Sequence, residues 1–287
     1  MAEHRPIRIA LTSDLHVDNS RANRDLVAEI VRRIRRLEPD ALVVAGDVAA
    51  TPGRVEWALE ELGAAPGVKI FCAGNHDIWL GPWDDRRRTN SWTKLRTTLP
   101  RIAREAGFEV VEDGPVRLDG VAFVGTIGWY DYSFRNRDLG HGDELYRSKE
   151  IGPYVWQDRR YASWGAADEE VAADCERRLA EAVDAAAAEP GVSRIVSVTH
   201  HVPFRELVDF SGHPVKDFFG AYMGSRGVGR ALGRSAKVAA ALFGHLHRRI
   251  DARVGSIRAV SSPVGYLRRW RGDVRALAAE RVALIEI

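Results

Sequence analysis

The 287-residue sequence predicts an α/β fold built around a mainly parallel sheet. Two patterns in the first hundred residues carry this prediction: apolar strands alternate with amphipathic helices, and the second strand is apolar at every position. A strand without alternation is expected to be buried on both faces, as in parallel sheets. Strand–helix–strand units at this spacing imply right-handed crossovers between parallel strands.

The first elements follow from the period of the apolar residues. A short strand is predicted over residues 7–12. Leu and Ile residues then recur at helical spacing over 26–37, and Pro39 ends that helix. The units that follow are a strand at 41–45, a helix at 55–62 and a strand at 68–73.

The elements after residue 90 are predicted from apolar periodicity and turn residues in the same way. Residues 92–106 predict a helix, and 116–124 predict a hairpin that turns at Asp119-Gly120. Helical periodicity returns over 168–188. Further strands are predicted at 194–198, 238–243, 250–254, 256–260 and 282–287.

Residues 126–165 interrupt this pattern with a cluster of aromatic side chains. Nine of the 24 aromatic residues lie between Trp129 and Trp164. They could form a lid or a base-stacking wall over an active site. They could equally form a small satellite core or a dimer contact. We therefore expect one domain over residues 1–287 with an aromatic-rich insertion at about 126–165.

Composition excludes several classes of protein. Lys and Arg total 42 against 40 for Asp and Glu, a formal charge of +2, which disfavours a nucleic-acid binder that relies on bulk positive charge. Two cysteines, Cys72 and Cys175, cannot build a disulfide framework or a cysteine-rich zinc site. The first apolar run is too short for a signal peptide or a membrane span. We therefore expect a cytoplasmic protein that does not contact membranes.

Histidine, Asp and Asn residues follow five of the predicted strands. Because the carboxyl ends of strands in an open α/β sheet share one edge, these segments are expected to converge on one crevice. Six of the nine histidines lie in them. The segments are Asp14-Leu15-His16, Gly46-Asp47, Gly74-Asn75-His76-Asp77, Thr199-His200-His201 and Gly244-His245-Leu246-His247.

These residue types indicate a metal centre. Carboxylates, imidazoles and one amide, without a thiolate, suit divalent Mn, Fe, Zn or Co. Residues at i and i+2 of an extended segment point the same way, so both ends of Asp14-x-His16 and of His245-x-His247 can reach one site. The ligands are too many for one tetrahedral zinc and suit two metals that share a carboxylate. Such pairs activate a bridging hydroxide for in-line phosphoryl displacement.

The five motifs, in this order, resemble those of the calcineurin-like metallophosphoesterase superfamily. The resemblance runs from about Ile7 to His247 and holds at every motif position. It implies a four-layer α-β-β-α sandwich of two mixed sheets, and a two-metal site in which Asp47 bridges. The other ligands that it implies are Asp14, His16 and His247 for one metal, and Asn75, His200 and His245 for the second.

The resemblance also implies a catalytic residue beside the metals. His76 would act there as general acid or transition-state stabiliser, paired with Asp77, which could fix its tautomer. His201 is expected either near the substrate or in a structural role. The segment 224–229 opens a predicted helix, so its amides and Arg226 could hold an anion.

The sequence thus predicts a dinuclear metal-dependent phosphohydrolase whose partner is a small phosphoester. A phosphodiester is preferred because His245-x-His247 resembles the cyclic-nucleotide and glycerophosphodiester branches of the family. The alternatives are a phosphomonoesterase of the same mechanism and a scaffold protein that has lost catalysis. Nuclease activity is not expected, because the near-neutral charge disfavours nonspecific duplex binding.

Overall fold

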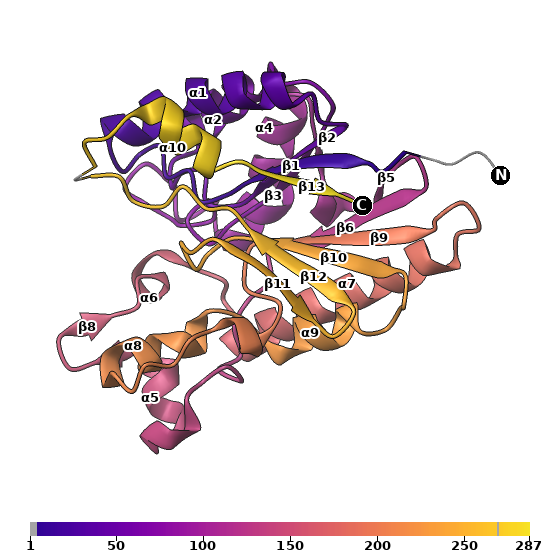
Figure 1. Ribbon diagram of the computed structural model, residues 1–287. Helices are drawn as coiled ribbons and strands as arrows, with labels where there is room; N and C mark the ends of the chain where they lie inside the picture. Colours follow the sequence, from indigo (N-terminus) through magenta and orange to yellow (C-terminus); the bar gives the residue numbers. More distant parts are fainter. Residues whose placement is uncertain (1–4, 269) are drawn as a thin grey trace.

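Two mixed β-sheets pack face to face in this computed structural model, which describes residues 5–268 and 270–287 (Figure 1). The first sheet has the order β13-β1-β2-β3-β4, and the second has the order β11-β12-β10-β9-β6-β5. The strands of the first sheet are β1 (Arg8–Thr12), β2 (Ala41–Ala45), β3 (Val68–Cys72), β4 (Phe108–Val110) and β13 (Ala283–Glu286). Those of the second are β5 (Val116–Leu118), β6 (Val121–Thr126), β9 (Arg194–Thr199), β10 (Val238–Phe243), β11 (Ile250–Val254) and β12 (Ile257–Ser261).

Each sheet has a parallel centre and antiparallel edges. Strands β1 to β4 are parallel and β13 is antiparallel to β1. In the second sheet β12, β10, β9 and β6 are parallel, whereas β11 and β5 pair antiparallel at the two edges. The carboxyl ends of β1, β2, β3, β9 and β10 therefore meet at one end of the sandwich, where the ligand motifs begin.

Helices cover the outer faces of both sheets, so the predicted four-layer sandwich is confirmed (Figure 1). The first sheet is covered by α1 (Arg21–Leu37), α2 (Pro52–Gly63), α4 (Leu99–Glu105) and α10 (Val274–Glu280). The second is covered by α7 (Asp168–Ala188) and α9 (Arg226–Leu232). No helix of the described chain is long and apolar enough to cross a membrane.

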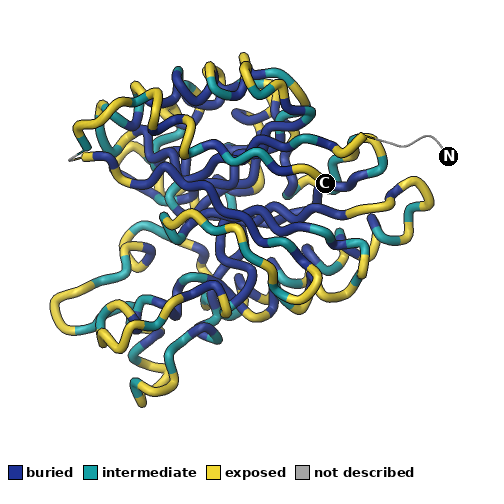
Figure 2. Tube along the Cα trace, in the orientation of Figure 1, coloured by how far each residue is buried: buried dark blue, intermediate teal, exposed yellow. Residues whose placement is uncertain are grey.

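Successive side chains along the central strands point to opposite faces of the sheet and belong to two different core layers. In β1, Ile9 and Leu11 face the second sheet, whereas Ala10 faces the helices. The same division holds in β2, where Val43 packs between the sheets and Val44 packs under the helices. The tube in Figure 2 is accordingly buried along the central strands of both sheets and exposed mainly at turns and outer helix faces.

The helix predicted over 92–106 is interrupted. It consists of α3 (Ser91–Thr93), a π-helical turn at Lys94–Thr98, and α4. Pro100 has no N–H to donate to the preceding turn, and its ring crowds the carbonyl four residues back. The backbone hydrogen bonds next to it therefore span five residues instead of four. The backbone N–H of Leu99 accordingly donates to the carbonyl of Lys94, five residues earlier.

The segment between β6 and α7 contains the predicted aromatic insertion. Its elements are α5 (Asp143–Ser148), the hairpin of β7 (Glu150–Ile151) and β8 (Tyr154–Val155), and α6 (Asp158–Tyr161). It lies beside α8 (Pro214–Phe219), at the lower left of Figure 1. Together these elements extend the sandwich beyond the strand ends that carry the motifs.

Candidate metal centre

The backbone turns sharply where each motif leaves its strand. Nine described non-glycine residues have positive φ, a conformation that is sterically costly for residues with a Cβ. Five of them belong to the predicted ligand set: Asp14 (53°), His16 (43°), Asp47 (56°), His245 (73°) and His247 (50°). Strain of this kind concentrates at functional sites, where the surrounding structure holds it in place.

The motif glycines make room for the ligands. A Cβ on Gly74 would lie 2.2 Å from Oδ1 and 2.3 Å from the backbone nitrogen of Asp47. Gly46 has φ +80°, and a Cβ there would lie 2.5 Å from Nδ1 of His200. The glycine before each of these ligand segments is therefore a packing requirement as well as a turn signal.

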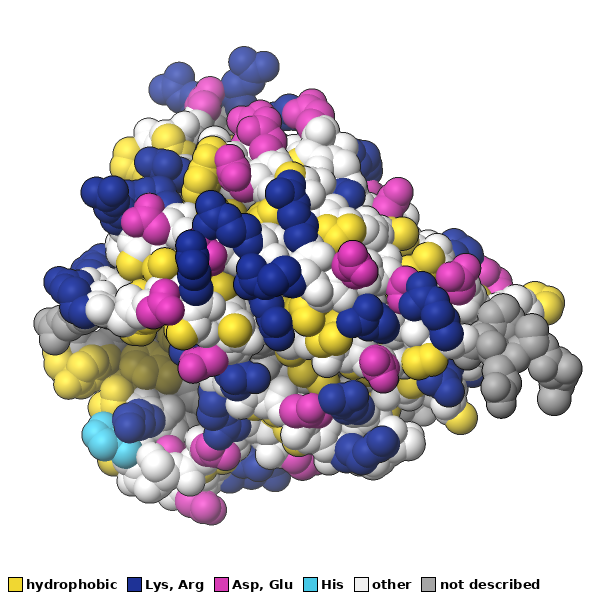
Figure 3. All heavy atoms as spheres, turned by 45° about the horizontal axis from the view of Figure 1, so that its top comes forward, with side chains coloured by type: hydrophobic (Ala, Val, Ile, Leu, Met, Phe, Trp, Pro, Cys, Tyr) yellow, Lys and Arg dark blue, Asp and Glu magenta, His cyan; other side chains and the backbone are white. Residues whose placement is uncertain are grey.

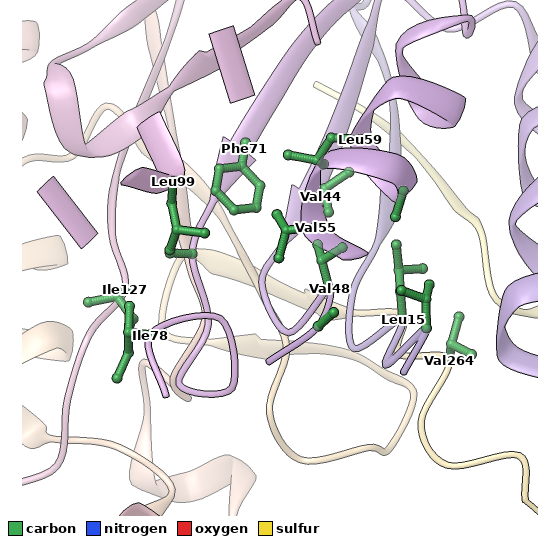
Figure 4. Close-up of a cluster of buried hydrophobic side chains, with 14 of the residues drawn as sticks. Leu15, Val44, Val48, Val55, Leu59, Phe71, Ile78, Leu99, Ile127 and Val264 are labelled. Carbon is green, nitrogen blue, oxygen red and sulfur yellow. The ribbon is translucent and has the colours of Figure 1, made fainter. Parts of the chain in front are cut away.

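Apolar residues inside the motif loops anchor them in the core. Leu15 lies between two predicted ligands, Val48 follows Asp47, and Ile78 follows Asp77. All three are buried in the cluster of Figure 4, together with core side chains such as Val44 and Leu59. The loops are thus fixed at both ends and in the middle, which limits movement of the polar side chains between these anchors.

The first group of ligand atoms comes from three strand ends. Asp14, His16, Asp47 and His247 each direct one nitrogen or oxygen into a cluster whose members lie within 4.8 Å of one another. Nε2 of His16 lies 2.9 Å from Nε2 of His247 and 3.7 Å from Oδ2 of Asp47. Nε2 of His247 lies 3.3 Å from Oδ1 of Asp14.

The second group shares Asp47. Nε2 of His200 lies 3.3 Å from Oδ1 of Asp47, 3.1 Å from Nδ1 of His245 and 3.0 Å from Oδ1 of Asn75. Backbone carbonyls assign the histidine tautomers: Nδ1 of His200 donates to Ala45, and Nε2 of His245 donates to Tyr222. The remaining nitrogen of each ring therefore faces the other ligand atoms, as in metal-bound histidines.

These separations fit divalent cations. Nitrogen and oxygen ligands about 2.0–2.2 Å from a metal lie roughly 3–3.5 Å from one another. Most of the distances within the two groups fall in or near this range. Asp47 turns Oδ2 toward the first group and Oδ1 toward the second, the arrangement that a bridging carboxylate requires.

The charges within the groups favour a cation. Burial lowers the pKa of His16, and burial together with neighbouring histidines lowers that of His245, so both imidazoles are neutral with a free lone pair. Burial alone would also lower the pKa of His200, but the Asp47 carboxylate raises it to about 9. The negative charge that holds this proton would attract a divalent cation in its place.

Asp77 does not pair with His76, so that prediction is wrong. Its carboxylate accepts four backbone N–H bonds, of 2.8–2.9 Å, from Asp47, Val48, Ala49 and Gly74. Asp77 faces into the protein because these amides surround its side chain, whereas His76 faces the opposite way. Its role is to join the Asp47 loop to the Asn75 loop.

His76 lies beside the first group, in an aromatic environment. Its Nε2 is 3.9 Å from Oδ2 of Asp47, and its ring stacks on Trp79 with the centroids 3.6 Å apart. The hydroxyl of Tyr266 lies 3.3 Å from the same Nε2. Burial lowers the pKa of His76 to about 3, which makes the imidazole neutral at neutral pH.

His201 and Arg226 lie outside the group of ligand atoms. The His201 ring is buried behind His245, with centroids 4.4 Å apart, and its Nδ1 donates to the carbonyl of Ile127. Arg226 is exposed, and its backbone N–H donates to the Ser133 hydroxyl. The Ser225 side chain caps the next amide of α9, so these two amides already have partners within the protein, and the anion contact at 224–229 stays a prediction.

The structure adds a residue that the sequence did not indicate. Asp158, 1% exposed at the start of α6, accepts a hydrogen bond of 2.9 Å from Nδ2 of Asn75. It also accepts from the indole N–H groups of Trp79, at 2.6 Å, and Trp156, at 2.7 Å. A lone Asp within an aromatic segment has no local pattern that distinguishes it.

Most of the insertion aromatics are buried in the same cluster as first-sheet core residues such as Leu15 and Val44, so they do not form the separate satellite core that was one of the expectations. Trp129, Tyr130, Tyr132 and Tyr146 are buried in one cluster with Phe218 of α8. Trp156 instead lines a cavity of about 420 Å³ that opens above the two ligand groups. Of the insertion, only Val155, Trp156 and Gln157 line this cavity. The prediction of a lid or wall over the active site therefore applies to these three residues alone.

Two overlapping groups of ligand atoms at the strand ends of a two-sheet sandwich define a candidate dinuclear metal site. The sequence profile of the calcineurin-like phosphoesterase family matches residues 7–249, and the chain belongs to that family. A comparison with curated protein sequences found no match.

Solved structures show the same fold. The phosphopantetheinyl hydrolase of Mycobacterium tuberculosis superposes with a TM-score of 0.71 at 21% identity, over 98% of this chain and 96% of that one. A dimetal phosphatase from Danio rerio gives 0.53 at 16% identity, over 90% and 87%. The TT1561 protein of Thermus thermophilus gives 0.52 at 13% identity, over 98% and 99%.

Proposed function

We propose that this protein is a dinuclear metal-dependent phosphohydrolase that acts on a phosphodiester. The observation that carries the proposal is the position of Asp47, whose two oxygens face two groups of ligand atoms. Asp14, His16 and His247 would complete one metal, and Asn75, His200 and His245 the other. Nitrogen and oxygen donors without a thiolate suit Mn, Fe, Zn or Co.

Charge balance favours a phosphodiester over a phosphomonoester. Asp14 and Asp47 are the anionic ligands, and they would neutralise half of the charge of two divalent cations. A phosphodiester and a hydroxide nucleophile together match the remaining charge, whereas a phosphomonoester dianion adds one more negative charge. None of the described residues that line the cavity is Lys or Arg, so that extra charge would have no side-chain partner.

In the proposed hydrolysis, the bound cations and the side chains around them would have different roles. Two bound cations would supply positive charge to the phosphoryl oxygens and lower the pKa of a water. The water-derived oxygen would form a bond to phosphorus while the bond to the leaving oxygen breaks. The neutral His76 imidazole would donate a hydrogen bond to that leaving oxygen, and Trp79 would hold the ring by stacking. Asp158 would orient the Asn75 amide.

Hydrolysis assays test this proposal. Metal-loaded protein should hydrolyse bis(p-nitrophenyl) phosphate with a kcat/KM at least tenfold above that for p-nitrophenyl phosphate. Asp47→Asn should abolish both activities, whereas Asp25→Asn, at an exposed position of α1, should retain them. A higher kcat/KM for the monoester would establish the phosphomonoesterase alternative. Absence of turnover with Mn, Fe, Zn and Co would support the scaffold alternative.

The proposed partner is a small molecule. In Figure 3, Lys and Arg side chains are interspersed with Asp and Glu over the visible face, which agrees with the formal charge of +2. An assay against single- and double-stranded nucleic acid should show little hydrolysis beside that of a small phosphodiester.

A further inference from the structure

The cavity above the ligand groups is larger than a phosphate group requires. Its volume of about 420 Å³ falls within the range of about 300–1,000 Å³ that is usual for small-molecule pockets. Its polar side consists of predicted ligands and the catalytic histidine: Asp47, Asn75, His76, His245 and His247. The rest of the volume must therefore accommodate what is attached to the phosphate.

The other side of the cavity is apolar. It is built from four separate parts of the chain: the loop after β3, the β8–α6 segment of the insertion, α8 with the turn after it, and the segments that flank β11 and β12. The lining side chains are Trp79, Val155, Trp156, Phe219, Met223, Leu246 and Tyr266, with Gln157 as the amide. Figure 3 shows hydrophobic side chains gathered in a hollow at the left edge, the side on which α8 lies in Figure 1.

The aromatic rings of this wall are held in place. Trp156 stacks on Tyr222, with centroids 5.3 Å apart and planes 11° from parallel. Trp79 stacks on both His76 and Tyr161. Both indole N–H groups donate to the buried Asp158, so the polar atoms of these side chains are already satisfied. A wall fixed in this way loses little side-chain entropy when a ligand binds.

The wall also disfavours ligand groups that carry a negative charge. The described lining residues include no Lys or Arg, and Gln157 offers one neutral amide. A second phosphate or a carboxylate on the ligand would lose its hydration without gaining a cationic partner. An uncharged apolar or flat group would instead bury its surface against the rings.

We infer that this wall is the subsite for the organic group of the substrate, and that this group is uncharged with a flat or apolar portion. The substrate is thus a phosphodiester with such a substituent, rather than a nucleoside polyphosphate or a sugar bisphosphate. The inference rests on the proposed function for the phosphodiester part, and on the cavity alone for the organic part.

Alkyl(methyl)phosphinates test the subsite directly, because each holds a monoanionic phosphinate group with two P–C bonds that the enzyme cannot hydrolyse. Isothermal titration calorimetry on metal-loaded protein should show benzyl(methyl)phosphinate binding at least tenfold more tightly than dimethylphosphinate. The 4-carboxybenzyl compound should lose most of that gain. Equal affinity for the benzyl and methyl compounds, or tighter binding of the carboxybenzyl compound, would overturn the subsite.

Two variants test whether the lining side chains cause the preference for the benzyl compound. Phe219→Ala and Met223→Ala remove lining side chains that make no hydrogen bond to Asp158, and each should reduce the benzyl-to-methyl ratio at least threefold. Trp83→Ala, at a 52% exposed tryptophan outside the cavity, should leave the ratio unchanged. An unchanged ratio in both lining variants would refute the assignment of this wall.

The binding assay is independent of turnover, so the two proposals can fail separately. If the benzyl preference is present and no phosphodiester is hydrolysed, the subsite stands and the proposed reaction is wrong. If phosphodiesters are hydrolysed and the three phosphinates bind alike, the reaction stands and the subsite is wrong.

Discussion

Asp158 accepts a hydrogen bond of 2.9 Å from the side-chain amide of Asn75, a predicted metal ligand from a different part of the chain. Asp158 begins α6 in the insertion, whereas Asn75 follows β3 in the first sheet. The same carboxylate holds the two indoles of the cavity wall. The insertion therefore contacts both the candidate metal centre and the substrate cavity through one buried side chain.

Substituting Asp158 should weaken metal binding without unfolding the protein. In Asp158→Asn one carboxylate oxygen becomes an NH2 group, so at least one of the three N–H donors loses its acceptor. We expect the affinity for the second metal to fall by about 10- to 100-fold, as when the orienting partner of a metal ligand is removed. Competition titration with a metal-binding dye measures it.

The matched control is Asp131→Asn. Asp131 also accepts side-chain hydrogen bonds, from Ser133 and Ser225, but it does not line the cavity. It should bind metal as the unsubstituted protein does. Equal metal affinity in Asp158→Asn and Asp131→Asn would show that Asp158 does not position Asn75.

His76→Ala should separate catalysis from metal binding. The His76 imidazole lies 3.9 Å from Asp47, outside the two groups of ligand atoms, so the metal content should be unchanged. The kcat for a phosphodiester with a poor leaving group should fall by about 10²- to 10³-fold, the usual effect of removing one hydrogen-bond donor to a charge that develops in the transition state. A substrate with a good leaving group should be affected less. Unchanged turnover of the poor substrate contradicts the role given to His76.

Gly74→Ala should damage the site through sterics alone. The new Cβ would lie 2.2 Å from Oδ1 of Asp47, so the carboxylate or the backbone must move. We expect loss of metal binding and a decrease of about 1–3 kcal/mol in the free energy of unfolding, typical of overpacking. Urea denaturation and metal analysis measure the two effects.

Gly53→Ala, in α2, provides the comparison. A Cβ at Gly53 meets no atom within 4 Å, and Ala is favoured over Gly inside a helix by roughly 0.5–1 kcal/mol. This variant should be as stable as the unsubstituted protein or more so, with full metal content. Metal loss in both variants would point to a general effect of added side chains rather than to the contact with Asp47.

The parts of the fold that the sequence predicted are those with a strong local cause. Strands such as β2 are continuous apolar runs, and α7 has a long helical period, so both were predicted with the bounds that the structure has. The short strand β4 was missed because three residues are too few for a period. The π-helical turn depends on Pro100 within an otherwise helical pattern, where the pattern indicates the helix but not its irregularity.

The site also contains residues with a local sequence signal and residues without one. The seven predicted ligands lie together because glycines and strand ends place each of them, and these signals are local. Asp77 was assigned to the wrong partner, since adjacency in sequence to His76 does not reveal that the two side chains point in opposite directions. Tyr266 and Asp158 reach the site only through the tertiary fold, and neither belongs to a motif.

Glu112 should make stability depend on pH. Burial raises its pKa to about 7 from the ordinary 4.5, so the folded protein binds this proton more tightly than the unfolded chain. Its contribution to the free energy of unfolding is therefore greatest below about pH 4.5 and is lost as the pH rises to about 7. Glu112→Gln removes the ionisation and should stabilise the protein at pH 8 by on the order of 1 kcal/mol.

Urea denaturation at pH 5 and pH 8 measures this effect. The difference between Glu112→Gln and the unsubstituted protein should be larger at pH 8 than at pH 5. Glu60→Gln, at an exposed position of α2, should show little difference at either pH. An equal shift at both pH values in Glu112→Gln would mean that the change is one of packing rather than of ionisation.

Asp47 is placed to serve two cations at once, and metal stoichiometry tests this role most directly. Equilibrium dialysis against Mn²⁺ followed by elemental analysis should give two tightly bound ions per chain. Asp47→Asn should retain at most one, because the bridging carboxylate contacts both groups. One ion or fewer in the unsubstituted protein, or two in Asp47→Asn, would contradict a bridging role for Asp47.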